Sequence, residues 1–582
     1  MKTIYNIKVL CLLGLAGATV TVHAQEDKKE KEQLNREMTL EREYDPSVQD
    51  ANKVNTLPVV KEPVVRKIPI DYAVYTMPAD PEKEISLLPS GNVMTDIQYN
   101  KRRGYFNFGG GTYLNLNGDL GYHILSTDKD KLNVWFSHRS TNGKVKSLEM
   151  EEKVKAKLND NLGGLNFSHV FDKLTLNLGA KYGYSAFNYY GFPIDRMPPV
   201  LPIEPDTKTN QVNQTIKFRA GVESKEGAQI GYLLDFDYIN FSHKYALNKE
   251  FDGPKENTFD VKFDLNAGFG GNQRVGLGGN VEYFNYSLPD AGVSSRQVFF
   301  ENHAEATFSP YYKAEGENWH VKLGVNAMFV TGENKKAMAS PNITADVEVA
   351  NKTVLYAQAT GKLYSNSVYD ISRINRYIDP TEELLPSRNF LDGIIGLKSG
   401  VAPGFWFDIF GGYKITKDEV FFVPKGDLTP AEFRNVSEGL QMDADHAFGG
   451  VDLKYSYQQL VDIRLKGVYN HWKIGEQENA RIDYKAYGKP EMEITAGVTV
   501  RPIRNLTASL DYYLATGRET LLREKNFKMK NINELNLSGT YTFNDTFGLY
   551  LHLNNILFQK YEVLYGYPLQ RFSALVGVNI NF

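Results

Sequence analysis

The sequence predicts an all-β fold: a transmembrane antiparallel outer-membrane β-barrel of about 22 strands, preceded by an extended N-terminal periplasmic arm. Three observations predict it. Apolar and polar residues alternate along long stretches of the chain. The connections between these stretches are alternately short turns and long polar segments. After the N-terminus, no apolar run reaches the ~20 residues that a membrane-spanning helix needs. A closed barrel crosses a bilayer without such a run, because closure pairs every backbone group.

Residues 1–24 have the features of a secretory signal peptide. Lys2 and Lys8 accompany an apolar stretch at 9–20, and a small-residue cleavage site precedes Gln25. The apolar stretch is too short for a spanning helix, and the residues before Cys11 do not fit a lipoprotein signal. Because Cys11 is the single cysteine of the chain, cleavage is expected to leave an exported protein that uses no disulfides.

Residues 25–95 are expected to form the periplasmic arm. A mixed-charge run opens the segment, and prolines recur after it, at Pro58, Pro63, Pro69, Pro78 and Pro81. Proline at this density favours an extended, polyproline-like chain over packed structure. The stretch VVRKIPI at 64–70 can add a strand to the sheet edge of a partner protein, but a solvated linker is the stronger interpretation.

Residues 96–582 are expected to form the barrel. In one typical stretch, Phe259, Val261 and Phe263 alternate with charged residues. Such runs reach about ten to fourteen residues, whereas strands of soluble sandwiches are typically about five or six. Short turns are expected at 171–173, 224–228, 270–273, 350–353, 502–505 and 544–545. Long polar segments lie between them, at 187–213, 242–257, 365–389, 418–444 and 515–528. Counting the hairpins gives about 22 strands, the number found in barrels with a plugged lumen.

The last strand is expected to act as a C-terminal insertion signal. Counting back from the terminus, apolar residues recur with period two: Phe572, Val576, Val578, Ile580 and Phe582. We expect this face to meet lipid, with the terminal aromatic residue near the periplasmic rim, where aromatic girdles occur.

Charged residues on the opposite strand faces are candidates for the wall of the lumen. The principal ones are Lys181, Lys217, Arg219, Glu223, Asp260, Lys262, Asp264, Glu282, Arg464 and Lys466; Asp235, Asp237, Glu305, Lys322 and Asp462 share the pattern. Both signs occur together, so no ion preference follows. A selective pore, a solvated wall and a surface on which the arm rests all remain open.

No local pattern predicts chemistry. The net charge of −4 gives no basic field for nucleic acid. The ten histidines are scattered without a metal-binding pair. The segment FGGGT at 108–112 lacks the Lys-Ser/Thr ending of a phosphate loop, and a tight strand bend explains its glycines better. We therefore expect no catalytic residues, no cofactor and no metal, and a protein that is not an enzyme.

Segments near the C-terminus resemble the signature of TonB-dependent outer-membrane receptors: LHLNNILFQKY at 551–561, GYPLQRF at 566–572, and the final Phe582. The segment RYIDP at 376–380, followed by Leu385-Pro386, is similar to a loop that leads into a strand in the same barrels. The resemblance covers roughly residues 100–582 and is closest to receptors of Bacteroidota-type bacteria. Phe558 and Gln570 depart from the family pattern, which has Asp and Gly there.

The resemblance implies uptake or passage of a solute across the outer membrane. That family also carries a globular plug between signal and barrel, for which residues 25–95 are too few. The missing plug favours an alternative, in which the barrel is a structural or assembly subunit of an outer-membrane complex. The expected partners are outer-membrane lipid and the barrel-insertion machinery, with TonB or other periplasmic and outer-membrane proteins implied by the resemblance; nucleic acid is not expected.

Overall fold

The computed structural model describes residues 102–146, 148, 153–191, 210–225, 227–246, 252–287, 300–425, 436–476, 481–522 and 524–582. The chain divides after Met77 into two units, and the described residues all belong to the second, Pro78–Phe582. The predicted signal peptide and arm, and the boundary predicted at residue 96, lie outside the described residues. Within the described ranges, no helix is long and apolar enough to cross a bilayer.

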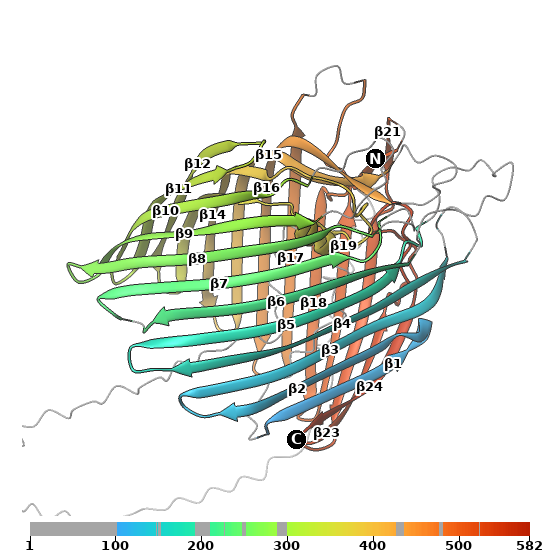
Figure 1. The fold of residues 1–582 in the computed structure, drawn as a ribbon. Coiled ribbons are helices and arrows are strands. Elements are labelled where there is room, and N and C mark those ends of the chain that lie inside the picture. Colours follow the sequence, from blue (N-terminus) through green and yellow to red (C-terminus); the bar gives the residue numbers. More distant parts are fainter. Residues whose placement is uncertain are drawn as a thin grey trace, which may run out of the picture. The chain divides into compact units, whose positions relative to one another are not determined.

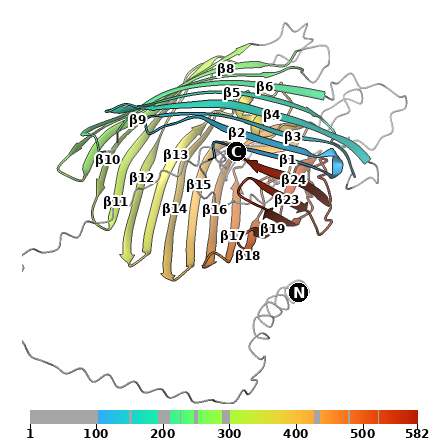
Figure 2. The ribbon, with the colours of Figure 1, turned by 90° about the horizontal axis from the view of Figure 1, so that it is seen from below.

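One antiparallel sheet of 22 strands closes on itself (Figures 1 and 2), as predicted. Strands that follow one another along the chain are neighbours in the sheet, and the first strand, β1 (Gly104–Gly111), also pairs with the last, β24 (Ser573–Asn581). The others are β2 (Leu116–Ser126), β3 (Asp130–Lys146), β4 (Lys153–Val170), β5 (Leu174–Asn188), β6 (Asn210–Ser224), β7 (Ile230–His243), β8 (Lys255–Phe269), β9 (Gln273–Ser287), β10 (His303–Glu315), β11 (Trp319–Val330), β12 (Lys336–Ala350), β13 (Thr353–Tyr364), β14 (Ser387–Ala402), β15 (Phe405–Pro424), β16 (Ser437–Tyr457), β17 (Val461–Ile474), β18 (Met492–Ile503), β19 (Leu506–Thr516), β22 (Ile532–Thr542) and β23 (Phe547–Asn554).

Few elements lie outside this sheet. A 3-10 turn, η2 (Thr112–Leu114), follows β1, and a short helix, α2 (Val368–Ile374), lies between β13 and β14. The strands β20 (Glu519–Leu522) and β21 (Lys525–Lys528) form a separate hairpin within the predicted loop at 515–528. Strand pairing in that loop was not expected from the sequence.

The two ends of the barrel differ in their connections. All the predicted short turns are present and lie at one end, the turn end, where the first strand begins and the last one finishes. The longer connections lie at the opposite end, the loop end. The loop predicted at 418–444 is shorter than expected, because β15 continues to Pro424 and β16 begins at Ser437. A register shift between Thr416 and Glu419 lets the strands continue through a polar stretch that reads as a loop.

The two faces of the sheet have opposite character. Along β8, Phe259 and Leu265 are 40% and 54% exposed, whereas Asp260 between them is 5% exposed. The same contrast recurs around the ring, so apolar side chains cover the outer surface and polar ones point inward. A water-surrounded sheet buries its apolar face instead. The chain therefore has the architecture of an integral outer-membrane β-barrel.

The glycine run at 109–111 lies at the seam where the barrel closes. Gly109 and Gly110 pair in unbroken register with both β2 and β24, and Gly111 pairs with β24 before the chain turns at η2, so the glycines themselves do not form the predicted tight bend. A Cβ atom on Gly109 would collide with the Tyr550 hydroxyl, and one on Gly111 would collide with the backbone of Ala574. The glycines therefore serve a close approach of strands and side chains at the seam.

The C-terminal residue completes the ring. Gly104 and Phe582 exchange both backbone hydrogen bonds, at 2.8 and 2.9 Å. The Phe582 ring is half exposed and lies 6.0 Å from the Tyr122 ring, and Val576 is 56% exposed. The outward face expected for the last strand is therefore observed at these positions. Its role as an insertion signal remains a prediction.

We predict that the two faces of β13 tolerate charge very differently. Ala357 is exposed on the outer face, and the adjacent Gln358 is exposed on the inner face at the same depth. Ala357→Arg should lower the free energy of unfolding by about 2 to 4 kcal/mol, because it places a guanidinium in lipid. Gln358→Arg should be nearly neutral. Denaturant titrations in lipid vesicles measure both; equal effects would show that the assigned faces are wrong.

We also predict that Phe582→Asp reduces the amount of folded barrel in the outer membrane, because a charge at the seam opposes the closure of the last edge. Phe543→Asp is the matched control: Phe543 is 51% exposed at the same end of the barrel but lies in a turn outside the seam. Heat-modifiable migration on gels measures folding. Equal folding of both variants would contradict the role given to the terminal residue.

Candidate functional site

The connection between β13 and β14, residues 365–386, folds into the barrel interior; we call it the cap. Near its start, the Ser365 hydroxyl donates to Glu305 on β10 at 2.9 Å. Further along, Arg376 donates to both carboxylate oxygens of Asp160 on β4 at 3.1 to 3.2 Å. Because β4 and β14 lie on nearly opposite sides of a ring of 22 strands, the cap crosses the lumen.

The local sequence explains the course of the cap. Ser367 caps α2 by accepting a hydrogen bond from the Asp370 backbone N–H at 3.2 Å. The helix then turns Val368 and Ile371 into buried positions, 6% and 4% exposed. Its polar side faces the wall, where Ser372 shares a hydrogen bond of 2.7 Å with His243 at the end of β7.

An aromatic cluster joins the cap to the far wall, the side of the barrel that contains Asp160 on β4 and Phe187 on β5. The Tyr377 ring stacks on Tyr567 at 4.1 Å, and lies 5.6 Å from Tyr190 and 6.0 Å from Phe187. Burial raises the pKa of Tyr190 and of Tyr377, so both phenols stay protonated at neutral pH. Tyr377 and Tyr567 belong to the two segments that carry the family resemblance. The structure brings these segments into contact.

A buried ion pair fixes the second half of the cap. The Asp379 carboxylate, which is 3% exposed, accepts from the Lys425 ammonium, and Glu382 lies 3.6 Å from the same ammonium. Burial acts to lower the pKa of Lys425, but the two carboxylates outweigh it and the net shift is upward. The lysine therefore remains charged and holds both acidic residues.

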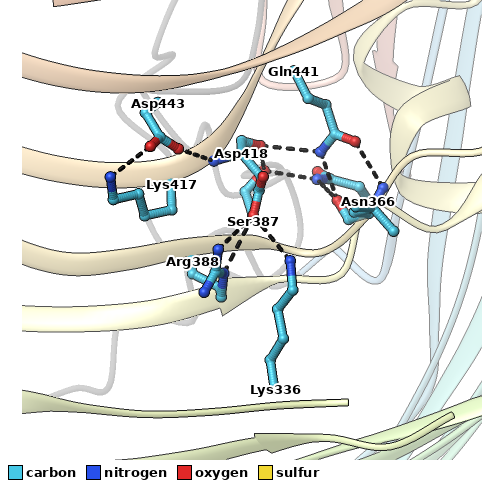
Figure 3. A network of polar contacts seen from close by, with 9 residues as sticks. Lys336, Asn366, Ser387, Arg388, Lys417, Asp418, Gln441 and Asp443 are labelled. Carbon is cyan, nitrogen blue, oxygen red and sulfur yellow. Dashed lines mark hydrogen bonds and ion pairs between the residues drawn. The ribbon is translucent and has the colours of Figure 1, made fainter. Parts of the chain in front are cut away.

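A polar network anchors both ends of the cap to the near wall, the strands β14 to β16 (Figure 3). The Asn366 amide donates to the Leu385 carbonyl and to the Ser387 hydroxyl, at 2.8 and 2.7 Å. Ser387 donates in turn to the Asp418 carbonyl at 2.6 Å. Gln441 donates to the same carbonyl and to that of Leu385, at 3.0 and 2.8 Å. The two ends of the cap are thus tied to each other and to β15 and β16.

Asp418 is the centre of this network (Figure 3). Its carboxylate pairs with Arg388 at 2.8 Å and with Lys336 at 3.4 Å, and its backbone N–H donates to Asp443 at 3.2 Å. Asp443 also pairs with Lys417 at 2.5 Å. Asp418 adopts a φ of 59°, a left-handed conformation that costs energy for a residue other than glycine. The ion pairs compensate for that cost at the irregularity of β15.

A cavity of about 170 Å³ lies between the cap and the inner wall formed by β14 to β18. The residues that give it its character are Ile371 and Ile374 from α2, Lys414 and Trp472 from the wall, Lys489 in the connection before β18, and Glu493 in β18. The His446 ring stacks on Trp472 at 3.9 Å, with the planes within 1° of parallel. The cavity thus combines aromatic, aliphatic and charged surfaces of both signs.

The predicted lumen charges largely neutralise one another. One group forms ion pairs across neighbouring strands or along one strand: Arg219 with Asp235 at 2.6 Å, Lys217 with Asp237 at 3.4 Å, Lys262 with Asp260 at 2.9 Å, and Arg464 with Asp452 at 3.0 Å. The others contact aromatic or polar groups. The Lys181 ammonium lies 6.0 Å from the centre of the Trp135 ring, and the Lys466 ammonium lies 5.9 Å from that of Phe410. Three carboxylates accept hydrogen bonds: Asp264 from Tyr311 at 2.9 Å, Glu223 from Asn177 at 3.5 Å, and Glu282 from Ser365 at 3.5 Å.

The structure gathers most of these charges on β5 to β9, and places Arg464 and Lys466 on β17, away from them. Two of them, Glu282 and Glu305, contact the cap through Ser365. Their role in selecting solutes remains a prediction. Sequence reasoning missed the cap, although it singled out the segment that contains Arg376 and Tyr377. Among the described residues, no group of metal-binding side chains is arranged to hold a metal ion.

Solved structures share this fold. The FrpB iron transporter from Neisseria meningitidis (F3-3 variant) has a TM-score of 0.63 and 10% identity, over 83% of this chain and 82% of that one. The siderophore receptor PirA from Acinetobacter baumannii has a TM-score of 0.61 and 10% identity, over 83% and 81%. The ferripyoverdine receptor of the outer membrane of Pseudomonas aeruginosa has a TM-score of 0.57 and 12% identity, over 83% and 72%.

At these identities the likeness shows the fold, and it confirms the outer-membrane barrel expected from the sequence resemblance. The sequence matches no protein-family model and no curated protein. The Bacteroidota type and the missing plug are therefore not shown.

The contact between Arg376 and Asp160 predicts a measurable effect on cap mobility. Both side chains are about one-third exposed, at 34% and 31%, so we assign the pair only about 1 kcal/mol, or roughly fivefold in the opening equilibrium. Arg376→Gln should speed hydrogen exchange in the cap by about that factor. Arg373→Gln is the control, because Arg373 is exposed on the same cap and lies against the ring of Tyr369, on the cap itself, without an ion pair among the described residues. The contact is not an anchor if both variants exchange alike.

Proposed function

We propose that the protein mediates uptake or passage of a solute across the outer membrane, and that the cap is the element that closes its lumen. The observation that carries this proposal is the course of the cap, which is anchored on nearly opposite walls of the barrel. A barrel of about this strand number encloses a lumen that must be plugged to prevent leakage. A segment fixed across the lumen meets that need.

The contacts of the cap differ in strength between the two walls. On the near wall, Asn366 and Ser387 are buried and hydrogen-bonded. On the far wall, the ion pair of Arg376 with Asp160 is partly exposed to solvent. Buried, satisfied polar networks are costly to break, whereas exposed ion pairs contribute little. The ion pair is therefore the weakest of these anchors, whereas the stack of Tyr377 on Tyr567 holds the cap to the far wall more firmly.

The structural neighbours include an iron transporter and a siderophore receptor, and this supports transport over a purely structural or assembly role and over catalysis. A subunit that only anchors partners would have no need for a cap tied to both walls. We further propose that the arm, residues 25–95, lies on the periplasmic side, does not fill the lumen, and offers a site for TonB or another periplasmic protein.

Removing the cap should open the barrel. Tyr364 and Ser387 are paired at the ends of β13 and β14, so a short turn can replace residues 366–385 without disturbing the hairpin. In planar bilayers, we expect large conductance steps from this variant and none from the full chain. Deletion of residues 25–95 is the comparison and should leave the barrel closed. Heat-modifiable migration confirms that each variant is folded.

Two results would contradict the proposal. Large conductance after deletion of the arm alone would identify the arm as the plug. A folded cap-deleted barrel that does not conduct would show that the cap is not what closes the lumen.

A further inference from the structure

We infer that the cavity beneath the cap binds a small zwitterion, an α-amino acid or a dipeptide, with its ammonium and carboxylate groups held by oppositely charged side chains. The inference rests on the proposed function for its biological role, since it names the class of solute. The evidence for it is the chemistry of the cavity wall.

The wall carries two ammonium groups and two carboxylates, Lys414, Lys489, Glu419 and Glu493. A site for an anion or for a cation would carry an excess of one sign. Balanced charges, placed around a cavity of about 170 Å³, instead match a ligand of the same small size that bears both signs. Each charged end of the ligand would then replace lost hydration with a charge-assisted hydrogen bond.

Two of these charges have spare bonding capacity. The Lys489 ammonium lies 3.8 Å from Glu419, beyond hydrogen-bonding distance, and 5.7 Å from the centre of the Trp472 ring. Glu493 has no hydrogen-bonded partner for its carboxylate within the described ranges, although Lys466 and Lys489 lie near enough to act on it electrostatically. A ligand carboxylate can therefore pair with Lys489, and a ligand ammonium with Glu493.

Of the other two charges, Glu419 lies beside Lys489, and Lys414 is better satisfied. Lys414 pairs with Asp392 at 3.4 Å and lies 5.4 Å from the Phe448 ring. Nearby, His446 is fixed by Asn470 at 2.9 Å and by its stack on Trp472. These groups give the site a rigid polar floor and leave Lys489 and Glu493 as the recognition pair.

Besides hydroxyl and amide side chains, the remaining wall has an apolar surface that belongs partly to the cap. Ile371 and Ile374 come from α2, while Val420 and Phe422 come from β15. This surface suits an aliphatic or aromatic side chain better than a charged one. Because the ligand would contact α2, its binding would also shift the equilibrium between closed and open positions of the cap.

Isothermal titration calorimetry on the purified full chain in detergent tests the inference. We expect leucine or the dipeptide Ala-Leu to bind, and the tighter of the two identifies the length of the ligand. N-acetyl-leucine, leucine amide and N-acetyl-leucine amide lack one or both charges and should each bind at least about tenfold more weakly. Glucose should not bind.

Variants locate the site. Lys489→Gln and Glu493→Gln should each weaken binding of the zwitterion at least about tenfold. Lys485→Gln is the matched control, because Lys485 lies in the same connection but pairs with Asp483 and does not line the cavity. It should bind as the unchanged chain does. If a charge variant fails to fold, tryptophan fluorescence of the unchanged chain gives a second readout of binding. The Trp472→Phe variant serves as its reference.

The inference is overturned if neither zwitterion binds, if N-acetyl-leucine amide or glucose binds as well as leucine, or if the charge variants bind as tightly as Lys485→Gln. These outcomes are separate from the proposed function. A barrel that conducts after removal of the cap but binds no zwitterion refutes the ligand class alone.

Discussion

Closure of the backbone hydrogen-bond ladder is the constraint on which the rest of the structure depends. In a bilayer, an unpaired sheet edge costs several kcal/mol for each exposed polar group, so the first and last strands must meet. Gly104 and Phe582 make that junction through reciprocal backbone bonds, and glycines at 109–111 let the strands and the Tyr550 side chain approach closely there. Closure at 22 strands then fixes a wide interior.

The side chains that line this interior determine where the cap can attach. Its polar side chains are mostly paired with one another, as Arg219 is with Asp235, so the wall itself needs no ligand for stability. The cap uses the remaining groups, reaching Asp160 on one side and the Asp418 network on the other. A segment of the barrel's own chain therefore crosses the lumen, and a charged and aromatic cavity lies where that segment meets the wall.

Much of the fold could be predicted because membrane strands have a simple period. The alternation of Phe259 and Asp260 fixes which face meets lipid, and the short turns fix the order of the strands. The cap could not be predicted in this way. The contact between Arg376 and Asp160 joins residues 216 positions apart, and no local periodicity encodes such a pair. The extension of β15 could not be predicted for a related reason. The irregularity at Asp418 is stabilised by Arg388 and Lys336, which belong to other strands.

The central claim is that the cap spans the lumen from one wall to the other. Zero-length carbodiimide cross-linking of an Arg376→Lys variant in intact outer membranes tests it most directly, because the reagent joins only amines and carboxylates that are already in contact. The account predicts a cross-linked peptide that joins residue 376 to Asp160 on β4. Cross-links from residue 376 only to the near wall, β14 to β16, would show that the cap does not cross the barrel and would contradict the account.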